Sequence, residues 1–154
     1  MRRTERSHRI GARVLEVAIL IALPILFHYL IPVMIVIPMP YSYLGAVLML
    51  LGLALMTWTS MLFRKAGGSF QLRGGGSVLV ISGPFQFSRN PMYLGMLIWL
   101  IGLAVLLGSL IAFLFPMLFF LLADFLVIPL EEKDMEQTAG ERFIEYKRHV
   151  RRWL

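Results

Sequence analysis

The chain has 154 residues, 58% of them hydrophobic, and its mean hydropathy is +0.76. This length fits one domain, and the composition excludes an ordinary soluble protein, so we predict an integral membrane protein. The formal net charge of +6 comes from basic residues beside apolar runs, where it suits anionic lipid headgroups better than nucleic acid. Because the chain has no cysteine, disulfides, thiolate metal sites and cysteine nucleophiles are excluded within it, and no other metal site is predicted.

The first predicted transmembrane helix covers about residues 15–37, directly after an arginine-rich start. Its apolar run is long enough for a bilayer, which needs roughly 20 helical residues. The run is also too long for a signal-peptide core and lacks a small-residue cleavage site, so we expect it to be retained. Pro24 and Pro32 predict kinks. His28 is either a proton carrier or, as we favour, a polar residue hydrogen-bonded between helices.

The second predicted transmembrane helix covers residues 43–63. Small residues along it permit close helix contacts, namely Gly45, Gly52, Ala54 and Ser60. The longest polar stretch of the chain follows at residues 64–90 and is basic and glycine-rich. Its glycines lack the Gly-Lys-Ser/Thr ending of a phosphate-binding P-loop, so they indicate flexibility or close backbone approach.

A third helix is predicted to begin at Asn90 and Pro91. Asn is a good N-cap, and Pro suits the first helical position because its missing N–H has no partner there. Free backbone N–H groups, the helix dipole and the charge of Arg89 together suit a carboxylate or a phosphate. The alternative, with equal weight, is a basic anchor at the membrane surface.

Residues 92–130 are uncharged apart from Asp124, and Gly108-Ser109 stands near the middle of this run. Two helices joined by a tight turn, at about residues 91–107 and 109–130, fit its length best. The predicted fold is therefore an all-α integral membrane protein with four transmembrane helices, a cytoplasmic loop and an amphipathic tail. All lysines and arginines then fall on one side, which the positive-inside rule makes cytoplasmic, together with both termini.

The hairpin of the last two helices brings their cytoplasmic ends to one level. We therefore expect Arg89, Asn90 and Tyr93 to lie near Glu131 and Glu132. One rim of this region offers a cation with helix N–H groups, and the other offers two carboxylates. Such a mixed-charge pocket suits a zwitterionic ligand with an apolar reaction partner, and Arg89 and Glu132 are its candidate catalytic residues. The alternative is that the glutamates are merely solvated.

The tail, residues 131–154, shows helical periodicity. Its apolar stripe consists of Met135, Ala139, Phe143, Tyr146, Val150 and Trp153. Gly140 is expected to break it into two helices. The basic cluster Lys147, Arg148, Arg151 and Arg152 would hold the second helix against the cytoplasmic leaflet. A lid over the pocket is the alternative.

Two blocks of the sequence resemble the membrane methyltransferases that include isoprenylcysteine carboxyl methyltransferase and the phospholipid N-methyltransferases. The first is Leu79-Val80 with Ser82-Gly83-Pro84-Phe85 and Arg89-Asn90-Pro91-Met92-Tyr93-Leu94-Gly95. The second is Glu131-Glu132 with Gly140, Phe143, Tyr146, Val150, Arg152 and Trp153. The resemblance implies S-adenosylmethionine at the cytoplasmic ends of the last two helices, in contact with Leu79, Val80, Phe85, Asn90, Pro91, Met92, Tyr93 and Glu131. Within the second block, Arg152 is the candidate for substrate binding.

Departures from the family pattern bear on the acceptor. Val127 stands where the isoprenylcysteine branch commonly carries an Arg that meets the substrate carboxylate, and Asn90 replaces that branch's His. The form Asn-Pro-Met-Tyr looks more like phospholipid methyltransferases and small bacterial relatives, which implies a lipid or lipidated acceptor and a bacterial inner membrane. Two other classes stay open: an NADPH-dependent membrane reductase of the sterol-reductase type, whose C-terminal pattern is similar, and a small four-helix transporter.

Overall fold

The computed structural model describes residues 19–30, 35–66 and 79–154 of the chain. The arginine-rich start, Pro32 and the glycines of residues 67–78 lie outside the described residues. Within the described ranges the chain is helical and contains no strand, and Ile35 forms an isolated antiparallel bridge with Ser109. The predicted all-α class is confirmed for these ranges.

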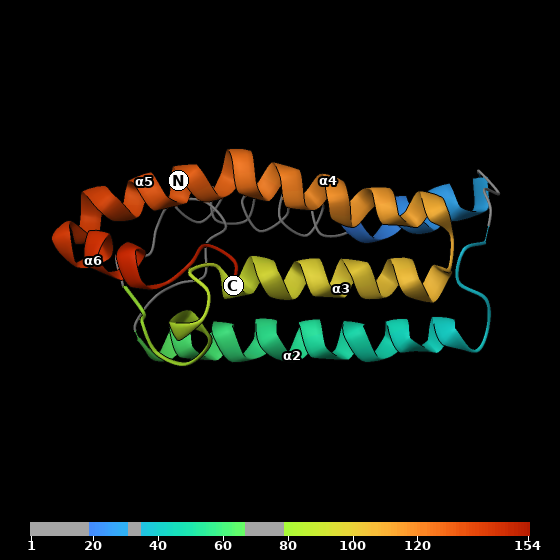
Figure 1. Cartoon of the computed structure of the whole chain (residues 1–154), viewed down its shortest axis with the longest axis horizontal. Helices are drawn as coiled ribbons and strands as arrows, with labels where there is room; N and C mark the ends of the chain where they lie inside the picture. The colour runs from blue at the N-terminus through green and yellow to red at the C-terminus, as the bar shows by residue number, and fades with distance from the viewer. Residues whose placement is uncertain (1–18, 31–34, 67–78) are drawn as a thin grey trace, which may run out of the picture.

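The described helices form an elongated bundle (Figure 1). In chain order they are the apolar helix Ile19–Leu30, the 3₁₀ turn η1 (Tyr41–Tyr43), α2 (Leu44–Lys65), η2 (Gly83–Gln86), α3 (Pro91–Leu107), η3 (Leu110–Phe113), α4 (Leu114–Leu122), the π-helical η4 (Ala123–Val127), α5 (Ile128–Ala139) and α6 (Glu141–His149). The view shows α3 lying between α2 and α4, and it contacts both. The helix Ile19–Leu30 meets α4 through the rings of Phe27 and Phe115, whose centroids are 5.7 Å apart.

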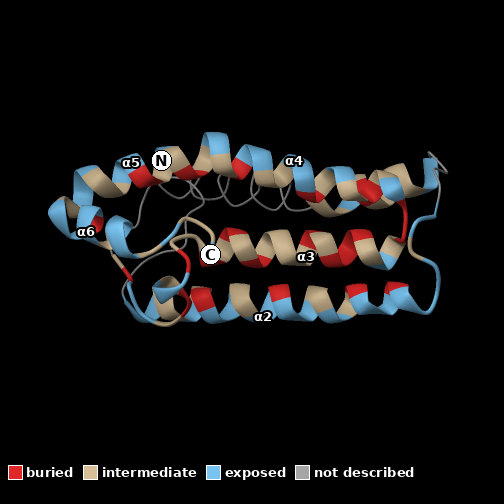
Figure 2. Cartoon of the chain, in the orientation of Figure 1, coloured by how far each residue is buried: buried red, intermediate tan, exposed pale blue. Residues whose placement is uncertain are grey.

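Within the described part of the chain, two helices are long and apolar enough to cross a membrane, Tyr41–Lys65 with 25 residues and Leu110–Ala139 with 30 residues. Two shorter apolar helices accompany them, Ile19–Leu30 and Pro91–Leu107. Figure 2 shows pale exposed residues along the outer sides of α2 and α4, whereas α3 is mostly buried or half-buried. Exposed apolar side chains on the outer helices suit contact with lipid. The four-span arrangement stays a prediction.

The tight turn predicted at Gly108-Ser109 is present. Gly108 has φ +64°, the left-handed conformation that ends many helices, and its N–H donates to the carbonyls of Ala104 and Val105. The second predicted break is also present, because Gly140 separates α5 from α6. The helix that starts at Leu110 does not stop at residue 130, where we expected the polar tail to begin, but continues to Ala139.

Glycines set the close packing of α2 against α3. They recur every seven residues on each helix, as Gly45 and Gly52 on α2 and Gly95 and Gly102 on α3, and they face each other in antiparallel order. A Cβ on Gly52 would lie 2.5 Å from the carbonyl oxygen of Gly95 and 2.7 Å from the backbone nitrogen of Trp99. Backbone meets backbone there, so no side chain can move aside. Close approach of this kind is how helices in lipid gain packing energy.

We expect Gly52→Val to destabilise the bundle by about 1–3 kcal/mol, because the added side chain forces two backbones apart. The matched control is Ala54→Val on the exposed face of the same helix, which should change stability by no more than about 0.5 kcal/mol. Thermal unfolding of both variants in detergent checks this. Equal midpoints for the two variants would show that the glycine contact does not limit helix packing.

Candidate functional site

The N-terminus of α3 lacks the side-chain cap that the sequence predicts. Pro91 occupies the first turn as predicted, but the Asn90 side chain makes no capping bond to α3. Instead, its amide Nδ2 donates to the carbonyl of Arg152, 3.2 Å away. The hydroxyl of Ser88 donates to the same carbonyl and accepts from the backbone N–H of Asn90, at 3.2 and 3.1 Å. The C-terminal residues therefore lie directly against this helix start.

Arg89 joins three parts of the chain. Its Nη2 donates to Glu132 Oε1 at 2.8 Å, forming an ion pair whose two side chains are 10% and 7% exposed. Its Nη1 donates to the carbonyls of Lys147 and Val150, both at 2.9 Å, at the C-terminal end of α6. Last-turn carbonyls lack helical partners, and a cation beside them is favourable. The anion that Arg89 meets is thus Glu132 of the same chain.

Glu132 is the centre of the charge network. Besides Arg89, it accepts from Arg152 through Nη2 at 3.2 Å and Nε at 3.4 Å, and Lys147 Nζ lies 3.4 Å from Oε2. Lys147 also pairs with the half-exposed Glu136 at 2.8 Å. We expected Lys147 and Arg152 to bind the leaflet, whereas these side chains make ion pairs within the protein. Arg148 and Arg151 remain exposed.

The second contact across the hairpin joins Tyr93 to Glu131. The phenol donates to Glu131 Oε1 at 2.8 Å. Tyr93 is 8% exposed and belongs to a buried cluster with Ala123 and Ile128, against which Val127 and Trp153 pack. The expected closeness of Tyr93 to Glu131, and of Arg89 to Glu132, is confirmed.

The loop before α3 is held by α6. The hydroxyl of Tyr146 donates to the carbonyl of Phe85 at 2.6 Å, and Phe143, 4% exposed, packs beside Tyr146 with ring centroids 6.2 Å apart. Burial raises the pKa of Tyr146 to about 12, against the opposing charge of Arg89, so the phenol stays a protonated donor at neutral pH. The same loop carries Val80, which is 8% exposed. The loop is therefore fixed by the tail.

The other residues that the resemblance assigns to the cofactor lie around these contacts. Leu79 is half-buried in the loop, Pro91 is buried, and Met92 is half-buried in the first turn of α3. The sequence analysis gave no role to Ser88 and noted Asp124 only as the single charge in an apolar run. The charge at position 124 in a long apolar run was a usable signal, because such a group needs a partner, whereas Ser88 carries no comparable signal.

Comparison with known families decides the class of protein. The profile of the phospholipid methyltransferase family matches residues 41–142, two thirds of the chain. The chain belongs to this family. The matched region includes the start of α3 and both glutamates, and it ends before Tyr146 and the C-terminal residues that pack against them.

The chain is also similar to an uncharacterized protein of Haemophilus influenzae, with 36% identity over 63 residues that cover 41% of this chain and all of that protein. No solved structure gives a significant match. Family membership implies a methyltransferase that acts on lipids, and the apolar helices indicate a membrane protein. Among the described residues, no group of three His, Asp or Glu side chains is arranged to hold a metal ion.

Proposed function

We propose that this methyltransferase transfers a methyl group from S-adenosylmethionine to a lipid or lipid-like acceptor at the cytoplasmic face of a bacterial inner membrane. The observation that carries the proposal is the hydrogen bond from Tyr93 to Glu131 beside the start of α3. It brings together two chain segments of the family match that both resemble cofactor-binding blocks. The proposal extends the family's activity to a particular methyl donor, acceptor class and membrane face.

The residues present fit S-adenosylmethionine chemically. A carboxylate suits the ammonium group or the ribose hydroxyls, and Tyr93 orients that of Glu131 by donating to its Oε1. The first turn of α3 receives no side-chain cap from Asn90 and suits the methionine carboxylate. Leu79, Phe85 and Met92 are half-buried and offer apolar surface for the adenine, whereas Val80 and Pro91 are buried. We propose that the half-buried residues contact the cofactor, together with the polar groups above, and that Val80 and Pro91 shape the site from within the protein.

The bound cofactor supplies a methyl group on a positively charged sulfur. In-line displacement neutralises that charge, so the chain's task is to align the reactants and exclude water. We propose that Glu131 and Asn90 orient the donor and that the ion pair of Arg89 with Glu132 fixes the elements around it. Arg152, the candidate for substrate binding, is bonded to Glu132 and Asp124, and an anionic acceptor must compete with these carboxylates for it.

Cofactor titration tests the donor. We expect Glu131→Gln and Asn90→Ala each to weaken S-adenosylmethionine binding by about 1–3 kcal/mol, because each loses a hydrogen-bonding group. Glu136→Gln, a half-exposed carboxylate on the same helix, is the matched control and should bind normally. Isothermal titration of purified protein in detergent with S-adenosylmethionine, and in parallel with NADPH, gives the affinities. Binding of NADPH alone would instead support the reductase alternative.

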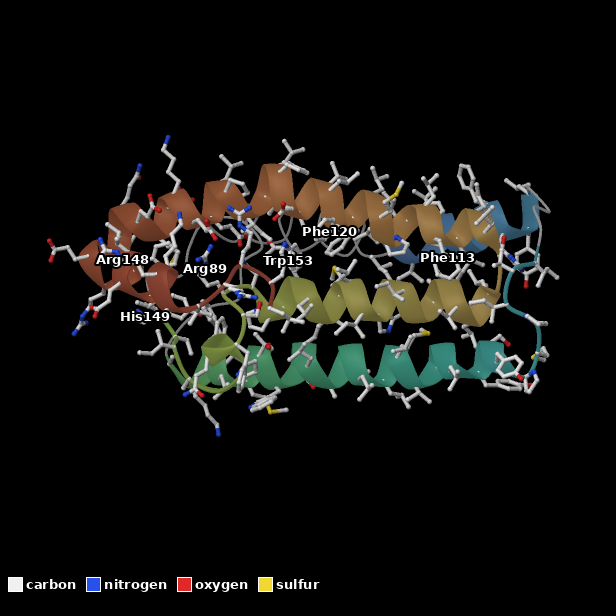
Figure 3. The ribbon with its side chains drawn as sticks, in the orientation of Figure 1. Arg89, Phe113, Phe120, Arg148, His149 and Trp153 are labelled. Carbon is white, nitrogen blue, oxygen red and sulfur yellow. The ribbon has the colours of Figure 1, made fainter. Side chains whose placement is uncertain are left out.

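The cytoplasmic face is supported by the distribution of charge. Arg64 and Lys65 lie at the C-terminal end of α2, at the same end of the bundle as α6. Figure 3 shows Arg89, Arg148 and His149 at this end and Phe113 at the opposite end. We expect cytoplasmic reporters fused after residue 154 or inserted near residue 75 to be active. A periplasmic reporter active at either position would contradict this orientation.

A further inference from the structure

Asp124 is a charged residue in the middle of an apolar helix, and two side chains donate hydrogen bonds to its carboxylate. Its Oδ1 accepts from Arg152 Nη1 and from the indole Nε1 of Trp153, both at 3.0 Å. A carboxylate in a membrane helix is costly unless it is paired and hydrogen-bonded. Both of these partners come from the last residues of the chain, which the family match does not cover.

The helix backbone at Asp124 is shaped for the same contact. In the π turn Ala123–Val127, the N–H of Ile128 bonds to the carbonyl of Ala123, five residues back, instead of to Asp124. The next residue in line, Pro129, has no N–H to offer. The Asp124 carbonyl is thereby released from the helix, and it accepts from Arg152 Nη1 at 3.3 Å. Nη1 of Arg152 thus donates to two oxygens of Asp124, the side-chain Oδ1 and the backbone carbonyl.

The last five residues, 150–154, form what we call the C-terminal strap. Its first residue, Val150, has extended φ and ψ of −117° and 131°. On one side its carbonyls accept from the backbone N–H of Arg89, from Ser88 and from Asn90. On the other side Trp153 binds Asp124 and packs on Phe120, with ring centroids 5.1 Å apart. Figure 3 shows Trp153 and Phe120 close together in the middle of the molecule, and Figure 1 shows the C-terminus at the start of α3.

We propose that Asp124 is a positioning residue for the methyl-transfer site, because it anchors the C-terminal strap across the start of α3. The inference rests on the proposed function. The strap accepts a hydrogen bond from Asn90, and Trp153 packs against the buried cluster that contains Tyr93; both Asn90 and Tyr93 are expected to contact the cofactor. With the anchor in place, the Asn90 amide and the Tyr93 ring are fixed and the site is covered from the tail side.

The test measures the solvent exposure of the strap and the binding of the cofactor separately. In a Trp58→Phe, Trp99→Phe background that binds S-adenosylmethionine normally, Trp153 is the remaining indole. We expect Asp124→Ala to raise acrylamide quenching of Trp153 severalfold, and to raise the dissociation constant and KM for S-adenosylmethionine by about tenfold, the usual effect of losing one charged hydrogen bond. The turnover number should change less. Glu145→Gln, an exposed carboxylate on α6, is the control and should leave every readout unchanged.

A second variant keeps the proposal testable if Asp124→Ala fails to fold. Pro129→Ala restores an N–H that competes with Arg152 for the Asp124 carbonyl and improves helix propensity, so it should fold well and show the same changes at smaller amplitude. Trp153 that stays protected in folded Asp124→Ala and Pro129→Ala overturns the proposal. Release of Trp153 with unchanged cofactor affinity overturns it equally, because the strap would then position nothing. If the unmodified protein fails to bind S-adenosylmethionine, the proposed function falls and this role falls with it, while quenching still decides whether Asp124 holds the strap.

Discussion

Glu132→Gln should lower the free energy of unfolding by about 3–5 kcal/mol, the range found when one partner of a buried ion pair is removed. The carboxylate is 7% exposed and faces Arg89, Arg152 and, at longer range, Lys147. Glutamine keeps the shape and one oxygen, but leaves the guanidinium of Arg89, itself 10% exposed, without its counter-charge. α6 and the C-terminal strap reach the bundle through the same arginines, so we expect them to detach before the rest of the protein unfolds.

Thermal or denaturant unfolding in detergent measures the loss, and limited proteolysis locates the detached segment. The matched control is Glu136→Gln, which breaks an ion pair with Lys147 in which the side chains are 40% and 39% exposed. Exposed pairs contribute at most about 1 kcal/mol, so this variant should unfold nearly as the unmodified protein does. A Glu132→Gln protein as stable as the control would mean that Arg89 and Arg152 find water or lipid headgroups as substitute partners.

The sequence predicted the elements that local chemistry decides. Helix-ending glycines have backbone requirements that can be read from residue type, which is why the breaks at Gly108 and Gly140 were anticipated. The contacts of Tyr93 with Glu131 and of Arg89 with Glu132 followed from hairpin geometry, because antiparallel helices of similar length bring their ends together. These predictions needed only residue types and the antiparallel geometry of one hairpin.

What the sequence did not predict depends on long-range partners. The periodic tail indicated an amphipathic helix on the leaflet, yet residues 150–154 leave the helix and enter the bundle. Periodicity reports which face of a segment is apolar and not what that face meets. The anion-binding interpretation assigned the charge of Arg89 to a ligand, whereas the nearby Glu132, whose closeness was predicted, pairs with it. The π turn at Ala123–Val127 has no single-residue signature, although the combination of Asp124 and Pro129 explains it afterwards.

The largest expected effect on activity concerns the length of the acceptor's tail. The candidate site lies at the end of the bundle where basic residues gather, and the neighbouring helices expose apolar side chains to their surroundings. We propose that the acceptor keeps its tail in the bilayer and presents its head at this level. Each buried CH₂ contributes about 0.8 kcal/mol to membrane partitioning, so removing four should lower kcat/KM, referred to bulk concentration, by roughly 200-fold.

Measuring transfer from labelled S-adenosylmethionine to a total lipid extract identifies the product, and a series of its short-chain analogues in vesicles then gives the chain-length dependence. The decisive comparison is between kcat/KM calculated from the bulk concentration of the acceptor and kcat/KM calculated from its mole fraction in the membrane. If the acceptor enters from the bilayer, kcat/KM expressed against its mole fraction in the membrane should vary little along the series, because the tail carbons then stay in the same apolar environment. A steep dependence on both scales would show instead that the protein itself binds the tail. Efficient methylation of a small soluble acceptor, with no label in the lipid phase, would overturn entry from the membrane altogether.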